Sequence, residues 1–307
     1  MTARGALVAA VLLGVACRVA QFAAGTSLFH DEAFVALNVR RIAPAALLGP
    51  LDWHEPSPPG FLRLEQLAVA AGGESERTLR ALPLLAGVAA VLAFAGLAAR
   101  ACIAPWGAAL AVLLLAASDK LIADASLVKH FSFDLLAAVA LIGLAWRANR
   151  SPSAAALLLW GAAAALALWL SYASAFVIAG GAAVLLPAVR RADVRGRTAL
   201  VAALALIGVS ALALYGAVAA QRSAPVLDFW SRAFPPFDDG VAATLVWLVR
   251  AVVGLFDYLW RPLGGLLLIA DAAAVQPYRR QRPALLALLW LPVAAGISSK
   301  PPSGRQR

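Results

Sequence analysis

The sequence predicts an all-α polytopic membrane protein with about nine transmembrane helices. Of its 307 residues, 63% are hydrophobic. The mean hydropathy is +0.83, and this value together with the composition lies far outside the usual range of soluble globular proteins. Several uninterrupted apolar stretches also reach the roughly 18 residues that indicate a membrane span. We therefore expect the chain to cross a bilayer many times.

Nine apolar segments have the composition expected of spans. They are residues 5–25, 81–100, 103–117, 132–147, 153–171, 173–189, 199–219, 260–275 and 283–297. Residues 5–17, which follow Arg4, could pass for the core of a signal peptide. Because apolar character resumes after Arg18 and many further spans follow, we expect an uncleaved signal anchor.

The distribution of basic residues predicts the orientation. With the N-terminus inside, the inner loops hold eleven arginines and a single acid, Asp193. The arginines are Arg4, Arg100, Arg147, Arg150, Arg190, Arg191, Arg195, Arg197, Arg279, Arg280 and Arg282. By the positive-inside rule, this asymmetry places the N-terminus in the cytoplasm. The formal charge of +10 thus reflects topology, so we expect membrane lipids and no nucleic acid as partners.

The high content of Ala, Arg and Leu suggests a bacterial source, and hence a location in the bacterial inner membrane. Cys17 and Cys102 lie in or beside apolar segments, with no second Cys or His at metal-ligand spacing. We interpret both as small buried hydrophobic residues.

Residues 241–258 are apolar enough to span, but a span here would move the basic cluster 278–282 to the outer side. Arg250 and Asp257 also interrupt the segment. We therefore predict that 241–258 is an amphipathic helix lying on the outer face.

Three outer segments remain, at 26–80, 118–131 and 220–258, within a single domain over 1–307. They contain twelve of the sixteen acids, if Asp257 is counted with the following span, and all three histidines. We therefore expect an outward-facing active site built from these loops.

The first outer loop begins with adjacent carboxylates, Asp31 and Glu32. Charges at a membrane edge cost free energy unless they pair, stay hydrated or take part in chemistry. Asp31 also opens a short predicted helix, so capping is an equal alternative to a catalytic role. His30, together with His54 and Glu55 of the same loop, leaves a divalent metal site open. Ordinary hydrogen bonding of these histidines is favoured, because the spacing is loose.

The order of motifs carries a resemblance. The Asp-Glu pair is followed by Pro-Pro-Gly-Phe-Leu at 58–62, and then by Glu-Arg-x-Leu-Arg-x-x-Pro at 76–83. Residues 128–134 then resemble a loop usually written Glu-x-Lys-x-Tyr. This order looks like that of the GT-C membrane glycosyltransferases, in the group related to protein O-mannosyltransferases and the bacterial aminoarabinose transferase. The resemblance is specific over about 28–134 and rests on topology alone from there to 297.

The resemblance implies a GT-C-like fold and an enzyme that takes a sugar from a polyprenyl-phosphate donor. The acceptor would be a lipid, a glycan or a protein on the outer face of the membrane. Asp31 is implied as the general base, with Glu32 supporting it or coordinating a metal. Lys129, Arg77 and Arg80, ranked in that order, are implied to bind the phosphate leaving group.

Further substrate-binding candidates come from the same two loops. Leu127 stands where relatives often have Glu, and Asp124, about one helical turn earlier, is the candidate for the missing carboxylate. His130 is expected to contact phosphate or acceptor, and His54 and Glu55 complete the set.

The sequence leaves two alternative functions open. A lipid or solute transporter or flippase would need charged or broken helices at the bilayer midplane, and Arg18 and Asp271 are the main charges within the spans. A non-catalytic, truncated remnant of the enzyme family is favoured by Leu127 and by the short polar tail after 297, where relatives commonly continue with further spans.

Overall fold

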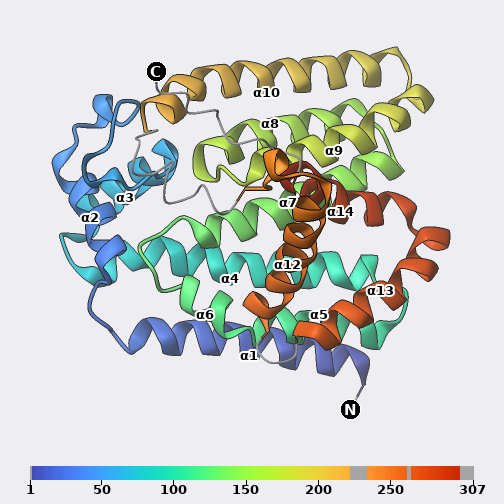
Figure 1. The fold of residues 1–307 in the computed structure, drawn as a ribbon, viewed down its shortest axis with the longest axis horizontal. Coiled ribbons are helices and arrows are strands. Elements are labelled where there is room, and N and C mark those ends of the chain that lie inside the picture. The colour runs from blue at the N-terminus through green and yellow to red at the C-terminus, as the bar shows by residue number, and fades with distance from the viewer. Residues whose placement is uncertain (1, 222–233, 261–263, 298–307) are drawn as a thin grey trace.

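A computed structural model describes residues 2–221, 234–260 and 264–297, which form helices and connecting loops without a strand (Figure 1). The helices of the first half are α1 Ala3–Ala23, α2 His30–Arg41, α3 Pro59–Gly72, α4 Glu76–Ala101, α5 Pro105–Ala116, α6 Asp119–Asp124 and α7 Phe131–Arg150. Those of the second half are α8 Ala154–Leu170, α9 Ser174–Ala188, α10 Val194–Ala220, α12 Val241–Leu259, α13 Gly264–Gln281 and α14 Pro283–Ile297. Short 3-10 turns lie at Pro44–Ala46, Asp52–His54, Val189–Arg191 and Phe237–Asp239.

Six of the described helices are long and apolar enough to cross a membrane. They are α1, α4, α7, α9 with its following turn, α10 and α12. The first five coincide with predicted spans, whereas the predicted spans 103–117 and 153–171 correspond to the shorter apolar helices α5 and α8. A multi-pass helical membrane protein is therefore supported, while the count of nine spans and the GT-C fold stay predictions.

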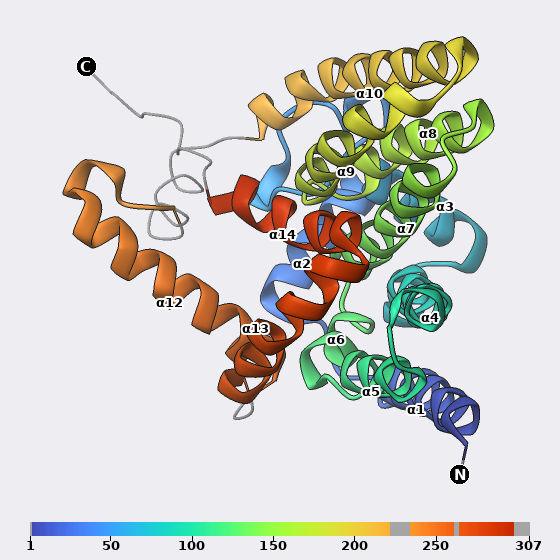
Figure 2. The same ribbon diagram turned by 90° about the vertical axis from the view of Figure 1, so that its right-hand side faces the viewer.

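The long helices lie side by side in one bundle, whereas α12 runs across their direction (Figure 1). In the second view, in which α4 is seen nearly end-on, α12 projects away from the bundle (Figure 2). The prediction of a helix over 241–258 is confirmed. By length and composition this helix also qualifies as a span, so its expected position on the outer face stays a prediction.

Small residues allow the bundle helices to approach closely. A Cβ atom added to Gly161 of α8 would lie 2.4 Å from the Cβ of Ala203 in α10. At Gly14 of α1 the corresponding distance to the Ala116 Cβ is 2.8 Å. Close packing of small residues is the usual basis of helix association in membranes, since lipid chains are as apolar as the helices themselves.

Arg18 is fully buried in α1, where an unpaired charge would be costly. Its guanidinium donates to the carbonyls of Gly14 at 3.0 Å and Ala116 at 3.2 Å, and to that of Leu115 at 3.5 Å. The last carbonyls of α5 have no partner within their own helix, and they carry the negative end of the helix dipole. Arg18 therefore caps α5.

Candidate functional site

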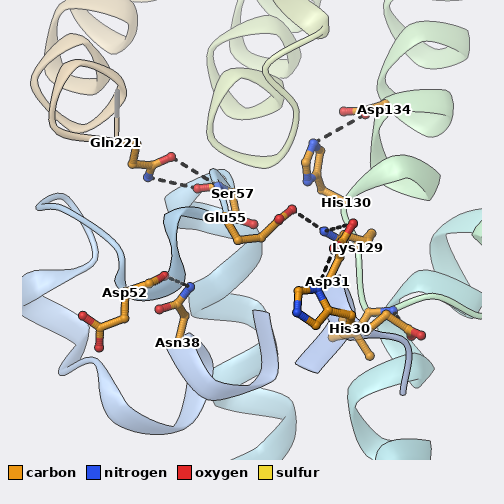
Figure 3. A network of polar contacts seen from close by, with 12 residues as sticks. His30, Asp31, Asn38, Asp52, Glu55, Ser57, Lys129, His130, Asp134 and Gln221 are labelled. Carbon is orange, nitrogen blue, oxygen red and sulfur yellow. Dashed lines mark hydrogen bonds and ion pairs between the residues drawn. The ribbon is translucent and has the colours of Figure 1, made fainter. Parts of the chain in front are cut away.

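Several of the predicted site residues meet where α2, α4 and α7 begin. Figure 3 shows Asp31, Glu55, Lys129 and His130 together. A small apolar core holds these elements together through Val35 of α2, Phe61 and Leu62 of α3, Leu79 of α4 and Val128 of the loop before α7. Loop residues far apart in the sequence are therefore fixed against one another.

Glu32 lies at the centre of a buried anchor and is only 2% exposed. Its carboxylate accepts hydrogen bonds from Arg80 Nη2 at 3.1 Å and Arg80 Nε at 3.2 Å. It also accepts from the backbone N–H groups of Phe29 at 2.9 Å and Val128 at 2.8 Å. Glu32 thus joins the start of α2 to α4 and to the second outer loop.

Arg80 is also buried, and its guanidinium is also fully hydrogen-bonded. It is 3% exposed, and besides Glu32 its guanidinium donates to the carbonyls of Thr26 and Ser27. All three side-chain nitrogens therefore have protein partners. Because the pair satisfies itself, the contacts of Glu32 and Arg80 are those of a structural ion pair.

Asp31 differs from Glu32 in its exposure and in its hydrogen bonds. The backbone N–H of Phe29, the residue that precedes α2, is bound by Glu32 and not by Asp31. The Asp31 side chain is 50% exposed, and its carboxylate lies 3.4 Å from His30 Nδ1 and 4.0 Å from Lys129 Nζ. In this structure Glu32 supplies the cap, and Asp31 is presented toward solvent.

Lys129 stands between two carboxylates that come from different parts of the first outer loop. Its ammonium pairs with Glu55 and lies near Asp31, while the rest of the side chain is buried (Figure 3). We call these three residues the Asp31–Lys129–Glu55 cluster. Asp124 is the candidate carboxylate partner from the sequence, but in the structure it is Glu55 that lies beside the lysine.

Asp124 makes a different contact. Its carboxylate forms a 3.0 Å salt bridge with Lys120 of the same short helix, α6. Burial raises the pKa of Asp124, against the opposing effect of Lys120. Arg77 is exposed at the start of α4 and has no contact with the cluster among the described residues. The structure therefore does not bring Asp124 or Arg77 to the cluster.

His130 follows Lys129 in the chain, and its side chain is largely buried. Its Nε2 lies 3.8 Å from Asp134, and its ring packs edge-on against Phe61 and Tyr172. Burial, with a further effect of the Lys129 charge, lowers the pKa of His130 to about 4. The imidazole is therefore neutral at pH 7 and can donate or accept one proton in a hydrogen bond.

An aromatic shelf, formed by His30, Phe34 and Trp53, flanks Asp31. The Phe34 and Trp53 rings stack with centroids 5.5 Å apart and an interplanar angle of 6°. His30 meets the edge of Phe34 at 4.2 Å. Trp53 has a φ of +65°, a backbone conformation that is uncommon for a bulky side chain, and it is 45% exposed. Such outliers concentrate at ligand sites.

Hydrogen bonds join the Pro-rich turn to Tyr172, which follows α8, and to Gln221, at the end of α10. The backbone of Ser57 donates to the Gln221 side chain, and its carbonyl accepts from Gln221 Nε2 and from the Tyr172 hydroxyl, each at 3.1 Å. These bonds fix the turn that carries Glu55. No sequence signal pointed to Tyr172 or Gln221, because both lie more than 100 residues from the turn.

A metal centre would need several ligating side chains to converge. Among the residues that the structure describes, no group of three or more His, Cys, Asp or Glu side chains converges as a metal site requires. The side chain of His54 lies outside the described residues. A divalent metal in the first loop stays a prediction.

Chemically, the site combines an accessible carboxylate, a cation beside it and an aromatic surface next to both. A carboxylate held in this way can accept a proton from a bound hydroxyl or amine, and the ammonium can stabilise a nearby anion. Comparison of this chain with protein-family models, curated proteins and solved structures gave no match.

Proposed function

We propose that this chain is an integral-membrane glycosyltransferase that transfers a sugar from a polyprenyl-phosphate donor to an acceptor on the outer face, with Asp31 as general base. One observation carries the proposal: of the two adjacent carboxylates, Glu32 holds the structure together, while Asp31 is half exposed beside Lys129. A charge at this position that is half exposed and does not hold the helices together is a candidate for chemistry.

The proposed reaction is a single displacement. The acceptor oxygen or nitrogen attacks the anomeric carbon and forms the new glycosidic bond while its proton passes to Asp31. The bond between that carbon and the phosphate oxygen breaks, and the electron pair leaves with the polyprenyl phosphate. This inverting route needs no protein nucleophile, in agreement with a sequence that has no Ser-His-Asp order.

Lys129 is assigned to the phosphate, as the cation nearest to Asp31. Arg80 is not assigned to this role, because its nitrogens are bound by Glu32 and by two backbone carbonyls. The aromatic shelf supports a sugar-binding role, since the partly exposed Trp53 ring stacks on Phe34, which packs against His30 beside Asp31.

The test is transfer of label from radiolabelled polyprenyl-phosphate sugars in membranes that contain the protein. Asp31→Asn is expected to reduce transfer about 10²–10⁴-fold, the usual contribution of a general base. Asp52→Asn is the matched control, because Asp52 is an exposed acid of the same loop whose carboxylate points away from the cluster (Figure 3). It should leave transfer unchanged.

Normal transfer by an Asp31→Asn protein that is present at wild-type level would exclude Asp31 as the base. Absence of transfer from every donor tested would instead favour the transporter or the remnant. The structure gives the transporter no support at Arg18, whose guanidinium donates to backbone carbonyls of α1 and α5.

A further inference from the structure

A second candidate binding site lies at the opposite end of the bundle. Helices α4 and α7 both begin at the cluster end, near Arg80 and Lys129, and end at Ala101 and Arg150. Between their C-terminal halves is a groove of about 1010 Å³. This volume is at the upper end of the ~300–1,000 Å³ typical of small-molecule pockets.

The groove walls are apolar and made largely of small side chains, including Ala93 and Gly96 of α4 and Ala140 and Gly143 of α7. A Cβ atom added to Gly143 would meet only the Leu97 Cδ1, at 3.9 Å. The space beside Gly143 is therefore open and apolar, as a hydrocarbon chain requires.

Three arginines, Arg100, Arg147 and Arg150, line the groove near the ends of the two helices, and all are exposed. Arg150 lies 5.2 Å from the ring centre of Trp146, and Arg282 lies 5.7 Å from the same ring. In the described part of the chain, no carboxylate is within salt-bridge distance of these four arginines.

Polar groups extend the charged end of the groove. A smaller cavity of about 170 Å³ shares Arg147 and Ser151 with it and adds Ser153 at the start of α8. One arginine has a bond of its own, since Arg100 donates to the carbonyl of Gly96 at 2.7 Å. Arg147 and Arg150 make no such bond among the described residues, so their N–H donors are available to an anion.

We propose that this groove, bounded by the arginines Arg100, Arg147 and Arg150, binds an anionic phospholipid, with an acyl chain between α4 and α7 and the phosphate among the guanidinium groups. Basic pockets between membrane helices on the cytoplasmic side bind lipid headgroups of this kind. The positive-inside rule places this end of the bundle at the cytoplasmic surface. The inference does not depend on the proposed glycosyltransferase activity.

A second groove has similar apolar walls but lacks the arginines, so it offers a comparison for the effect of charge on lipid selectivity. A groove of about 330 Å³ between α1 and α5 has apolar walls that include Leu13 and Trp106, and its lining contains no arginine. An anionic lipid should therefore prefer the α4–α7 groove, whereas a zwitterionic lipid should not distinguish the two on the basis of charge.

The experiment measures binding of lipids to the purified full-length protein by native mass spectrometry after incubation with vesicles. One set of vesicles contains phosphatidylcholine alone and the other phosphatidylcholine with phosphatidylglycerol. Wild type is expected to retain phosphatidylglycerol. Arg147→Gln combined with Arg150→Gln should weaken that binding by roughly fivefold per arginine, about 25-fold in all, since each basic residue near the surface contributes about 1 kcal/mol.

The matched control is Arg190→Gln combined with Arg191→Gln, which removes two exposed arginines outside both cavity linings. It should bind phosphatidylglycerol as wild type does. Gly143→Leu fills the groove without changing charge and should remove the bound lipid, so the proposal stays testable even if the double arginine variant fails to fold.

Two outcomes would overturn the proposal. One is retention of phosphatidylglycerol at wild-type level by the Gly143→Leu protein or the folded double variant. The other is full displacement of the bound lipid by millimolar inorganic phosphate, which would identify the arginines as a site for free phosphate.

Discussion

Replacing Arg80 with methionine tests whether the buried ion pair with Glu32 is structural. Methionine keeps a flexible, unbranched side chain in place of the aliphatic stem of arginine and removes the charge. It also removes the hydrogen bonds to Glu32 and to the carbonyls of Thr26 and Ser27. The Glu32 carboxylate would then stay buried with only the N–H groups of Phe29 and Val128.

The expected cost follows from burial. Arg80 is 3% and Glu32 2% exposed, so neither group can turn to water when its partner is lost. Removing one partner of a buried pair typically costs 3–5 kcal/mol, because the remaining charge is left uncompensated. At about 2–4 °C per kcal/mol, the Arg80→Met protein should melt roughly 6–20 °C lower than wild type.

The assay is thermal unfolding of the purified protein in detergent micelles, followed by tryptophan fluorescence. Arg77→Met is the matched control, since Arg77 is exposed one turn earlier on the same helix, and it should change stability by no more than about 0.5 kcal/mol. Adding Glu32→Leu to Arg80→Met should recover part of the loss. If Arg80→Met costs less than about 1 kcal/mol, or if the two single losses simply add in the double variant, the pair is not a structural anchor.

Three further predictions use the same unfolding assay. Glu65 of α3 is fully buried with no hydrogen-bond partner among the described residues, and burial raises its pKa to about 8 from an ordinary 4.5. The folded protein therefore holds this proton longer than the unfolded chain, and stability should fall by up to about 5 kcal/mol as pH rises from 4.5 to 8. The part of the fall that Glu65 contributes should be lost in Glu65→Gln, and a wild-type profile in that variant would contradict the assignment. His130 has the opposite sign: its pKa of about 4 lies below the ordinary 6.5, so stability should fall by about 3 kcal/mol as pH drops from 6.5 to 4. That loss should disappear in His130→Gln, and its persistence would mean that another group is responsible. Gly161→Val would push α8 away from Ala203 and should cost about 1–3 kcal/mol or more, whereas Gly208→Val, with open space around it, should cost much less; equal losses would exclude close packing as the cause.

The helices could be predicted from the sequence because their signals are local. A run of apolar residues gives a helix in a membrane whatever its neighbours are, since every backbone N–H and C=O must be satisfied within the segment. The predicted spans over 5–25 and 199–219 accordingly match α1 and α10. The segment 241–258 is ambiguous in the sequence, because its hydropathy fits both a span and a surface helix, and only the charge distribution favours the surface helix.

The candidate site was only partly predictable. That Asp31, Lys129 and Glu55 lie in loops or at helix starts between the apolar segments could be inferred from residue type and motif order. Which carboxylate caps α2, and which one pairs with the lysine, could not. These pairings depend on a shift of one position along a helix and on contacts between loops 74 residues apart.

By itself, the sequence determined that this is a helical membrane protein and that its acids and histidines gather in a few loops, because hydropathy and composition are properties of short segments. The tertiary structure decided the roles within those loops. In the fold, the Glu32 carboxylate is hydrogen-bonded by Arg80, 48 residues away, and by the backbone N–H of Val128, 96 residues away. The Asp31 side chain stays half exposed. Adjacent carboxylates are chemically alike, and they take different roles because the fold surrounds one with donors and leaves the other exposed to water.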